Sequence, residues 1–365
     1  MVRAAARHDV PLDPPSDEPS VAAKVAGLYY ISDSIPGISR RRCGRGFIYL
    51  TPDGQRIRGT ATIARIKQLV IPPAWQEVWI APFAHAHIQA VGRDDRGRKQ
   101  YIYHPEWIRI RDAAKFDRMV AFSEALPEIR SRTDRDLRRQ NLPKEKVLAT
   151  VVRLLDSTYV RIGNMQYAKE NASFGLTTLR NRHVEVSGAN IRFEFRGKRG
   201  IEQRVDIHDK RLARIIRQCL DIPGYTLFQY YDEEGKRQPI DSGDVNAYLH
   251  EIAGGAFTAK DFRTWGGTLE AMLALLEIGE AVTQTQAKKN VVQAIKQVAK
   301  QLGNQPSACR KYYIHPAILQ SYMEGDLVAK VQAEFNRLQR KPQHIDPIAL
   351  QSEEKVMLSL LKTCE

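Results

Sequence analysis

The chain of 365 residues is long enough for about two domains at roughly 150 residues each, and its 43% hydrophobic content is sufficient for buried cores. Its formal net charge of +14 favours a polyanionic partner. Its four cysteines form no C-x-x-C pair, which argues against a zinc site or a disulfide framework. No apolar run reaches the ~18 residues of a membrane span and no secretory signal is recognisable, so we expect a cytoplasmic protein without membrane contact.

The N-terminal third of the sequence predicts a tail followed by a small sheet domain. Residues 1–22 are rich in Pro, Asp, Ser and Glu, and such a segment buries too little apolar surface to fold, so we expect a disordered tail. Short apolar runs separated by turn residues then predict a β-rich domain over residues 23–108, with one helix near residues 60–69. Its expected strands lie at 48–50, 78–80, 87–92 and 100–104.

Residues 109–340 predict a larger, mainly helical domain. Segments 115–125 and 143–163 have amphipathic helical spacing, and Gly163-Asn164 is interpreted as the C-cap of the second helix. Thr258 and Asp261 have the spacing of a capping box, which begins another long helix. The helical pattern is broken by an extended patch near 226–240.

A hairpin with a basic tip interrupts these helices. Ile191, Phe193 and Phe195 alternate with charged residues, and residues 201–207 form the expected opposite strand. The turn between them is Gly197-Lys198-Arg199-Gly200. The sequence therefore predicts an α+β protein, with a small β-sheet domain before a mainly helical domain that has a small sheet of its own. Residues 341–365 form a C-terminal tail of unknown role, in which 353–361 could be a short helix.

Four features of the larger domain carry basic or nucleophilic side chains. They are Arg161 near a predicted helix end, Lys198 at the hairpin tip, Arg263 near a helix start, and Tyr313 in the segment Arg-Lys-Tyr-Tyr-Ile-His-Pro. Taken singly, each has an ordinary structural explanation, such as an arginine beside helix carbonyls or a core tyrosine with a satisfied hydroxyl. Their order along the chain carries more information than any one of them.

In that order the features resemble the type IB DNA topoisomerases, in the short poxvirus-like form found in bacteria, over roughly residues 25–330. The family's two catalytic arginines lie in Arg-x-Gly-Asn and Lys-Asp-Phe-Arg-Thr, and its lysine lies in Phe-x-Phe-x-Gly-Lys; these motifs are present here at 161–164, 260–264 and 193–198. The nucleophile precedes an apolar-polar-Pro triplet, as Tyr313 does, whereas Tyr312 is one residue off the pattern. Nine residues before the nucleophile the family has His or Asn, here Asn304.

The resemblance implies an isomerase that acts on double-stranded DNA at the nucleoid, as a monomer that closes around the duplex like a clamp. Tyr313 would nick one strand and form a 3′-phosphotyrosyl intermediate, the free strand would rotate to relax positive and negative supercoils, and the 5′-hydroxyl would attack back, without ATP, metal or other cofactor. Arg161, Arg263 and Asn304 would stabilise the phosphate charge, and Lys198 would protonate the leaving 5′-hydroxyl.

Residues 92–104, with the sequence GRDDRGRKQYIYH, resemble the segment with which this family contacts duplex DNA. By that resemblance the DNA-binding residues are Arg98, Lys99, Gln100, Tyr101 and Tyr103, with Gln100 and Tyr101 approaching bases and backbone. Basic side chains interleaved with aromatic ones suit contacts to phosphates and base edges. Without the resemblance, the segment is a basic turn beside a strand.

Two alternatives stay open at this point. A tyrosine site-specific recombinase uses a similar set of residues on a related catalytic fold, but its second arginine usually lies in His-x-x-Arg, and here Lys260 is three residues before Arg263. A non-catalytic architectural DNA-binding protein would explain the positive charge, although it would not require the five residues of the predicted site.

Overall fold

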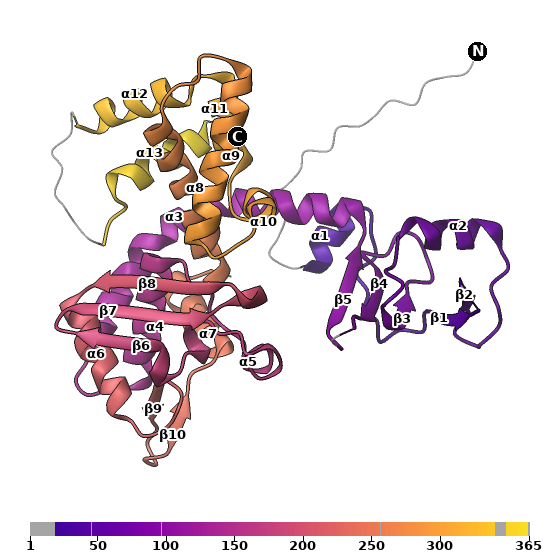
Figure 1. Cartoon of the computed structure of the whole chain (residues 1–365), viewed down its shortest axis with the longest axis horizontal. Helices are drawn as coiled ribbons and strands as arrows, with labels where there is room; N and C mark the ends of the chain where they lie inside the picture. Colours follow the sequence, from indigo (N-terminus) through magenta and orange to yellow (C-terminus); the bar gives the residue numbers. More distant parts are fainter. Residues whose placement is uncertain (1–18, 45, 96, 256, 340–347, 364–365) are drawn as a thin grey trace. The chain divides into compact units, whose positions relative to one another are not determined.

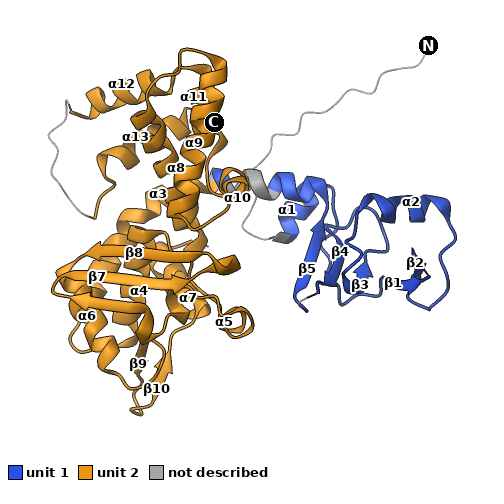
Figure 2. Ribbon diagram, in the orientation of Figure 1, with its two compact units in different colours: residues 1–117 blue, residues 118–365 orange. Residues whose placement is uncertain are grey.

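The computed structural model describes residues 19–44, 46–95, 97–255, 257–339 and 348–363, apart from the side chains of 19, 111–115 and 117 (Figure 1). It divides into two compact units, Met1–Asp117 and Arg118–Glu365 (Figure 2). The division lies inside the long helix α3 (Pro105–Leu137), whereas the sequence placed the domain boundary between residues 108 and 109, near the start of that helix. Within the described residues, no helix combines the length and the apolar character needed to cross a bilayer.

Unit 1 is built on a five-stranded antiparallel sheet in the order β2–β1–β3–β4–β5. The elements are β1 (Ile38–Cys43), β2 (Gly46–Leu50), α2 (Thr60–Gln68), β3 (Gln76–Ile80), β4 (Ile88–Arg93) and β5 (Lys99–Tyr103). The four predicted strands and the predicted helix are therefore confirmed. Strand β1 was not predicted, because its sequence Ile-Ser-Arg-Arg-Arg-Cys has no apolar alternation; it is defined by its pairing with β2 and β3.

Helix α1 (Pro19–Val25) corrects the predicted extent of the N-terminal tail. The prediction of disorder is wrong for residues 19–22, and residues 1–18 lie outside the described part of the chain. Ala23 is fully buried and packs with Leu28 and with Trp107 of α3. Small alanine side chains let the helix approach the indole closely, and that burial stabilises a segment whose composition alone predicts disorder.

Unit 2 combines a three-stranded antiparallel sheet with a group of helices. The sheet consists of β6 (Val184–Ser187), β7 (Asn190–Arg196) and β8 (Glu202–His208), and a small hairpin of β9 (Gln229–Tyr231) and β10 (Arg237–Pro239) accounts for the predicted extended patch. The predicted alternation on β7 is confirmed, since Ile191, Phe193 and Phe195 are buried. Helix α6 (Lys210–Asp221) packs against β6 and β7.

The buried helix α8 (Ala259–Ile278) forms the centre of the helical part. It packs against α4 (Lys144–Thr158), α7 (Ser242–Ala253), α9 (Gln284–Gln301), α11 (Pro316–Glu324) and α13 (Ser352–Lys362) (Figure 1). The remaining helices are α5 (Met165–Asn171), α10 (Pro306–Tyr312) and α12 (Leu327–Gln339). The C-terminal segment thus contains the expected short helix, and that helix is packed into the unit through the buried side chains of Val356, Met357 and Leu361.

The end of α4 differs from the prediction. The helix ends at Thr158, because Tyr159 adopts the left-handed conformation (φ 55°, ψ 19°). Asn164 does not cap this helix; its side chain accepts a hydrogen bond of 2.9 Å from the N–H of Tyr167 and so caps the N-terminus of α5. Asn occurs in both kinds of cap, and after Gly163 the sequence pattern assigned it to the wrong helix.

Candidate active site

Tyr313 lies in the short link between two helices whose ends hold it in place. Its N–H donates to the carbonyl of Cys309, one turn earlier on α10, at 2.9 Å. On the other side, His315 caps α11 by accepting a hydrogen bond from the N–H of Ala317 at 3.1 Å, and Ile314 is fully buried. The backbone of Tyr313 is therefore restrained from both directions.

Helix α8 approaches the backbone of Tyr313 through a pair of glycines that the sequence analysis did not single out. A Cβ atom at Gly267 would lie 2.6 Å from the carbonyl oxygen of Tyr313, and one at Gly266 would lie 2.2 Å from the ring of Tyr159. Thr268 Oγ1 accepts a hydrogen bond from the N–H of His315 at 3.0 Å and lies 3.3 Å from the carbonyl oxygen of Tyr313. Two consecutive glycines inside a helix are a signal of close backbone approach that could have been used.

Arg263 is buried beside Tyr313, near the start of α8. The predicted capping box is confirmed, since the Asp261 carboxylate accepts from the N–H of Thr258 at 2.7 Å. Arg263 is 3% exposed, and its Cζ lies 4.9 Å from the centroid of the Tyr313 ring. Its guanidinium donates to the carbonyl of Tyr159 and, at 2.9 Å, to that of Leu302. Its Nε is buried without a hydrogen-bond partner among the described residues, which leaves a donor for a bound group.

Arg161 reaches the same place from the extended segment between α4 and α5. Its guanidinium donates to the carbonyl of Gly303 at 3.1 Å and to Oδ1 of Asn304. Its own carbonyl accepts from the N–H of Leu176 at 2.9 Å, and a Cβ at Gly175 would lie 2.5 Å from that carbonyl oxygen. The backbone of Arg161 is therefore fixed by close packing against Gly175.

Asn304 lies in the loop between α9 and α10 and has one donor to spare. Its Oδ1 accepts from Arg161, whereas its Nδ2 is buried and has no hydrogen-bonded acceptor among the described residues. The nearby Cys309 thiol is a weak acceptor at best, and burial raises the pKa of that thiol. The free amide nitrogen fits the predicted role of Asn304 as a hydrogen-bond donor.

Lys198 lies at the tip of the β7–β8 hairpin, as predicted, in the short turn Lys198–Gly200. The side chain is exposed, yet partial loss of hydration and the positive charge of Arg161 lower its pKa below the ordinary lysine value. The neighbouring Arg199 donates to Oε1 of Gln305 at 2.8 Å. That contact, which the sequence analysis missed, ties the hairpin tip to the start of α10.

The charges around Tyr313 favour its ionised form. Burial raises the pKa of Tyr313, but the positive charges of Arg263 and Arg161 outweigh burial, so the pKa lies below the ordinary tyrosine value. Burial and the charge of Arg161 lower the pKa of Arg263 to about 10, which still leaves it protonated at neutral pH. Unit 2 thus brings a phenol, two arginines, a lysine and an amide donor together, and this set can bind a phosphodiester and attack it.

The predicted DNA-binding residues lie on β5 and the turn before it, in unit 1. Arg98 and Gln100 both bind the Asp94 carboxylate, at 2.7 Å and 3.0 Å, and Lys99 pairs with Asp33 at 2.6 Å. The rings of Tyr101 and Tyr103 are stacked, with centroids 5.9 Å apart.

Because side chains alternate along a strand, Lys99, Tyr101 and Tyr103 share one face of β5 and Gln100 lies on the other. β5 is also an edge strand of its sheet. The structure therefore distributes the predicted DNA-binding residues of this strand over two faces rather than one common surface.

The chain is similar to known proteins in both of its units. Residues 104–341 match the family model described as "Eukaryotic DNA topoisomerase I, catalytic core", and residues 46–94 match "Bacterial DNA topoisomerase IB, N-terminal domain". The DNA topoisomerase 1B of Acanthamoeba polyphaga mimivirus is 34% identical over 299 residues, which cover 79% of this chain and 88% of that protein. The DNA topoisomerase 1B of Vaccinia virus (strain Copenhagen) is 25% identical over 269 residues, which cover 72% and 80%.

Proposed function

The chain belongs to the type IB DNA topoisomerases, and from that premise we propose that Tyr313 is the nucleophile that opens one DNA strand. The alternative of a non-catalytic DNA-binding protein is set aside, because the family is a family of enzymes. The match to topoisomerases in both units also favours this family over the tyrosine recombinases.

The proposed reaction exchanges one phosphodiester for another. The phenolate oxygen of Tyr313 forms a bond to phosphorus, and the bond from phosphorus to the 5′-oxygen breaks. Lys198 gives its proton to the departing 5′-oxygen, and the phenol proton leaves to solvent. The product is a 3′-phosphotyrosyl ester and a free 5′-hydroxyl. Religation is the reverse, with the 5′-hydroxyl attacking and Tyr313 leaving. Because the number of P–O bonds is conserved, the cycle needs no energy from ATP. In this proposal the cationic side chains of the site, rather than a metal ion, stabilise the phosphate charge.

The observation that carries this proposal is the presence of two unpartnered buried donors beside Tyr313. Arg263 Nε and Asn304 Nδ2 both have no hydrogen-bond partner within the described residues, although burying a donor unpaired is costly. Non-bridging phosphate oxygens would satisfy both of them. Together with the guanidinium of Arg161 they would stabilise the charge that develops in the transition state.

Rotation of the free strand about the intact one then relaxes positive and negative supercoils alike. We propose that the protein does this as a monomer whose two units close around double-stranded DNA, which would place it at the nucleoid. Arg98, Lys99, Gln100, Tyr101 and Tyr103 are the proposed contacts of unit 1. Lys99 would exchange its present partner Asp33 for a DNA phosphate.

Relaxation of plasmid DNA tests the proposal directly. The protein should relax positively and negatively supercoiled plasmid in EDTA without nucleotide, and Tyr313→Phe should bind DNA but not relax it. Tyr312→Phe is the matched control, because Tyr312 is adjacent but its ring lies against Lys311 rather than Arg263. Mapping the covalent adduct should find the protein joined to the 3′ end of the cleaved strand. Relaxation by Tyr313→Phe, or protein joined to the 5′ end, would refute the assignment.

A further inference from the structure

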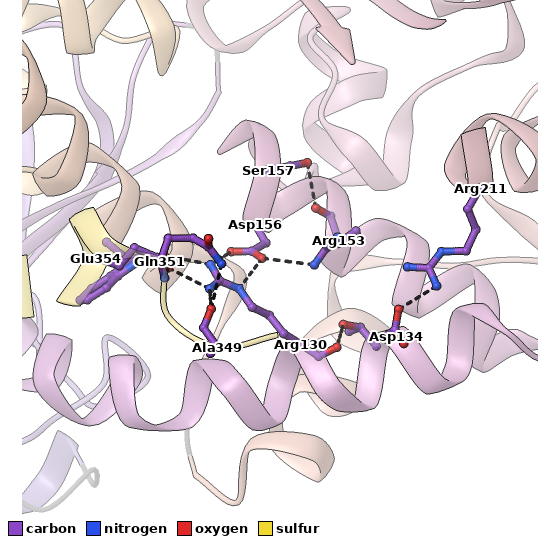
Figure 3. A network of polar contacts seen from close by, with 11 residues as sticks. Arg130, Asp134, Arg153, Asp156, Ser157, Arg211, Ala349, Gln351 and Glu354 are labelled. Atoms are coloured by element: carbon purple, nitrogen blue, oxygen red, sulfur yellow. Dashed lines mark hydrogen bonds and ion pairs between the residues drawn. The ribbon is translucent and has the colours of Figure 1, made fainter. Parts of the chain in front are cut away.

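A buried ionic network connects the C-terminal helix α13 to helices α3 and α4 (Figure 3). Arg130 of α3 donates to both oxygens of Asp156 on α4, at 2.9 and 3.0 Å. The same guanidinium donates to both oxygens of Glu354 on α13, each at 2.9 Å. Both ion pairs are bidentate, which fixes the orientation of the two carboxylates as well as their distance.

Glu354 is fully used as an acceptor. Besides Arg130, its Oε1 accepts from the indole N–H of Trp265 at 2.9 Å, and its Oε2 accepts from the N–H of Gln351 at 2.9 Å. The residue is 4% exposed. Burial raises the pKa of Glu354, but the hydrogen bonds and charge of Arg130 outweigh it and keep the carboxylate ionised. Such a network does not by itself imply stability, because desolvating its charges is costly; its value is in fixing geometry.

The network restrains Arg263 from two directions. Trp265 is two residues after Arg263 on α8, so Glu354 restrains the turn of helix that carries the guanidinium. Asp156 lies in the last turn of α4, and the next residues lead to Tyr159, whose carbonyl accepts from Arg263. Arg130 and Glu354 therefore tie the helix that bears Arg263 to the segment that receives its hydrogen bond.

Helix α13 lies after residue 341, where the match to the topoisomerase catalytic core ends. We propose that Glu354 is a positioning residue for Arg263, and that α13 is for this reason a working part of the catalytic unit rather than a tail. Glu354 sets the position of Trp265 directly and that of the end of α4 through Arg130. The inference rests on the proposed role of Arg263 in stabilising the phosphate charge.

Three variants of the full-length protein test this inference by single-turnover cleavage of a DNA duplex at saturating protein. Glu354→Gln removes the negative charge at nearly constant shape. Trp265→Phe removes the indole donor and keeps an aromatic ring, although the smaller ring also leaves a cavity at this buried position. Lys362→Ala is the matched control, because it breaks the exposed pair of α13 with Glu124 at 2.9 Å and leaves the network intact. Thermal unfolding and the Kd for DNA are measured in parallel, and rates are compared well below the unfolding midpoint of every variant.

We expect Glu354→Gln to lower the cleavage rate about 10-fold, which corresponds to roughly 1.4 kcal/mol of transition-state stabilisation, with an unchanged Kd. Trp265→Phe should lower it by a smaller factor, and Lys362→Ala should not change it. The deciding measurement repeats Glu354→Gln on an Arg263→Ala background. If Glu354 acts through Arg263, adding Glu354→Gln to Arg263→Ala should cause no further loss of cleavage rate.

The outcomes separate the two proposals. If Arg263→Ala alone cleaves at the parent rate, the proposed role of Arg263 is wrong. If Arg263→Ala is slow and Glu354→Gln lowers the rate by the same factor on both backgrounds, Glu354 does not act through Arg263 and the positioning role is refuted. A folded Glu354→Gln and a folded Trp265→Phe that both cleave at the parent rate would refute it as well.

Discussion

Gly267 of α8 lies so close to Tyr313 that a Cβ atom there would be 2.6 Å from the carbonyl oxygen of Tyr313. Real Cβ atoms essentially never lie that close to backbone, so a larger residue requires either the helix or the link between α10 and α11 to shift. The absence of a side chain at Gly267 therefore sets the distance between the helix that carries Arg263 and the proposed nucleophile.

Gly267→Ala should slow cleavage strongly while the protein stays folded. Alanine favours a helix interior by ~1 kcal/mol over glycine, which offsets part of a packing penalty of roughly 1–3 kcal/mol. Displacing a reacting group by about 1 Å can cost on the order of 10²-fold in rate. Single-turnover cleavage should thus fall by at least ~10-fold, with a small change in the unfolding midpoint.

Gly46→Ala is the control for this substitution, because nothing lies within 4 Å of a Cβ at Gly46. It should cleave like the parent protein. Equal rates for Gly267→Ala and Gly46→Ala would show that the link can shift without consequence for the reaction.

Thr268→Val should slow cleavage and also destabilise the fold. Valine keeps the shape but removes Oγ1, which leaves the N–H of His315 without its acceptor at 3.0 Å. A buried donor left unpaired costs roughly 1–3 kcal/mol, and because this N–H is only partly buried we expect a loss at the low end of that range. Thr268→Ser retains the hydroxyl and should keep most of the cleavage rate. If Thr268→Ser is slow and Thr268→Val cleaves like the parent protein, the methyl group and not the hydrogen bond positions the link.

The proposed site residues each lie within a short motif that the sequence displays, and the structure brings Arg161, Lys198, Arg263, Asn304 and Tyr313 into one unit. The contacts between distant segments could not be predicted. Arg130 and Glu354 are 224 positions apart, and no local pattern marks either as a partner of the other. For the same reason the C-terminal tail had no assigned role.

The local errors have local physical causes. Tyr159 ends α4 in a left-handed conformation that non-glycine residues seldom adopt, so propensity extends the helix too far. Its ring lies against Gly266, a contact made only in the folded protein. Strand β1 is rich in arginine, and only its pairing with β2 and β3 identifies it.

The cleavage rate should depend on pH as a bell-shaped curve. The rate should rise as Tyr313 loses its proton and fall as Lys198 loses the proton it must donate. The pKa of Tyr313 is lowered from 10.0 and that of Lys198 from 10.5, so both limbs should lie below these values. Lys198→Ala should be slow and lack the falling limb, whereas Lys236→Ala, on the exposed β9–β10 hairpin, should keep the parent profile. A falling limb that survives in Lys198→Ala would assign the proton donor elsewhere.

Substitutions at Asn304 separate its two hydrogen-bonding atoms. Asn304→Asp keeps an acceptor for Arg161 but replaces the free Nδ2 donor with a negatively charged oxygen. If Nδ2 donates to a phosphate oxygen, the introduced carboxylate would instead repel that oxygen. The cleavage rate of Asn304→Ala should then fall by on the order of 10-fold or more, and that of Asn304→Asp should fall further. If Asn304 only holds Arg161, the order reverses, because Asp still accepts from that guanidinium and Ala does not. The ranking of the two single-turnover rates therefore decides whether Asn304 touches the phosphate or acts only through Arg161.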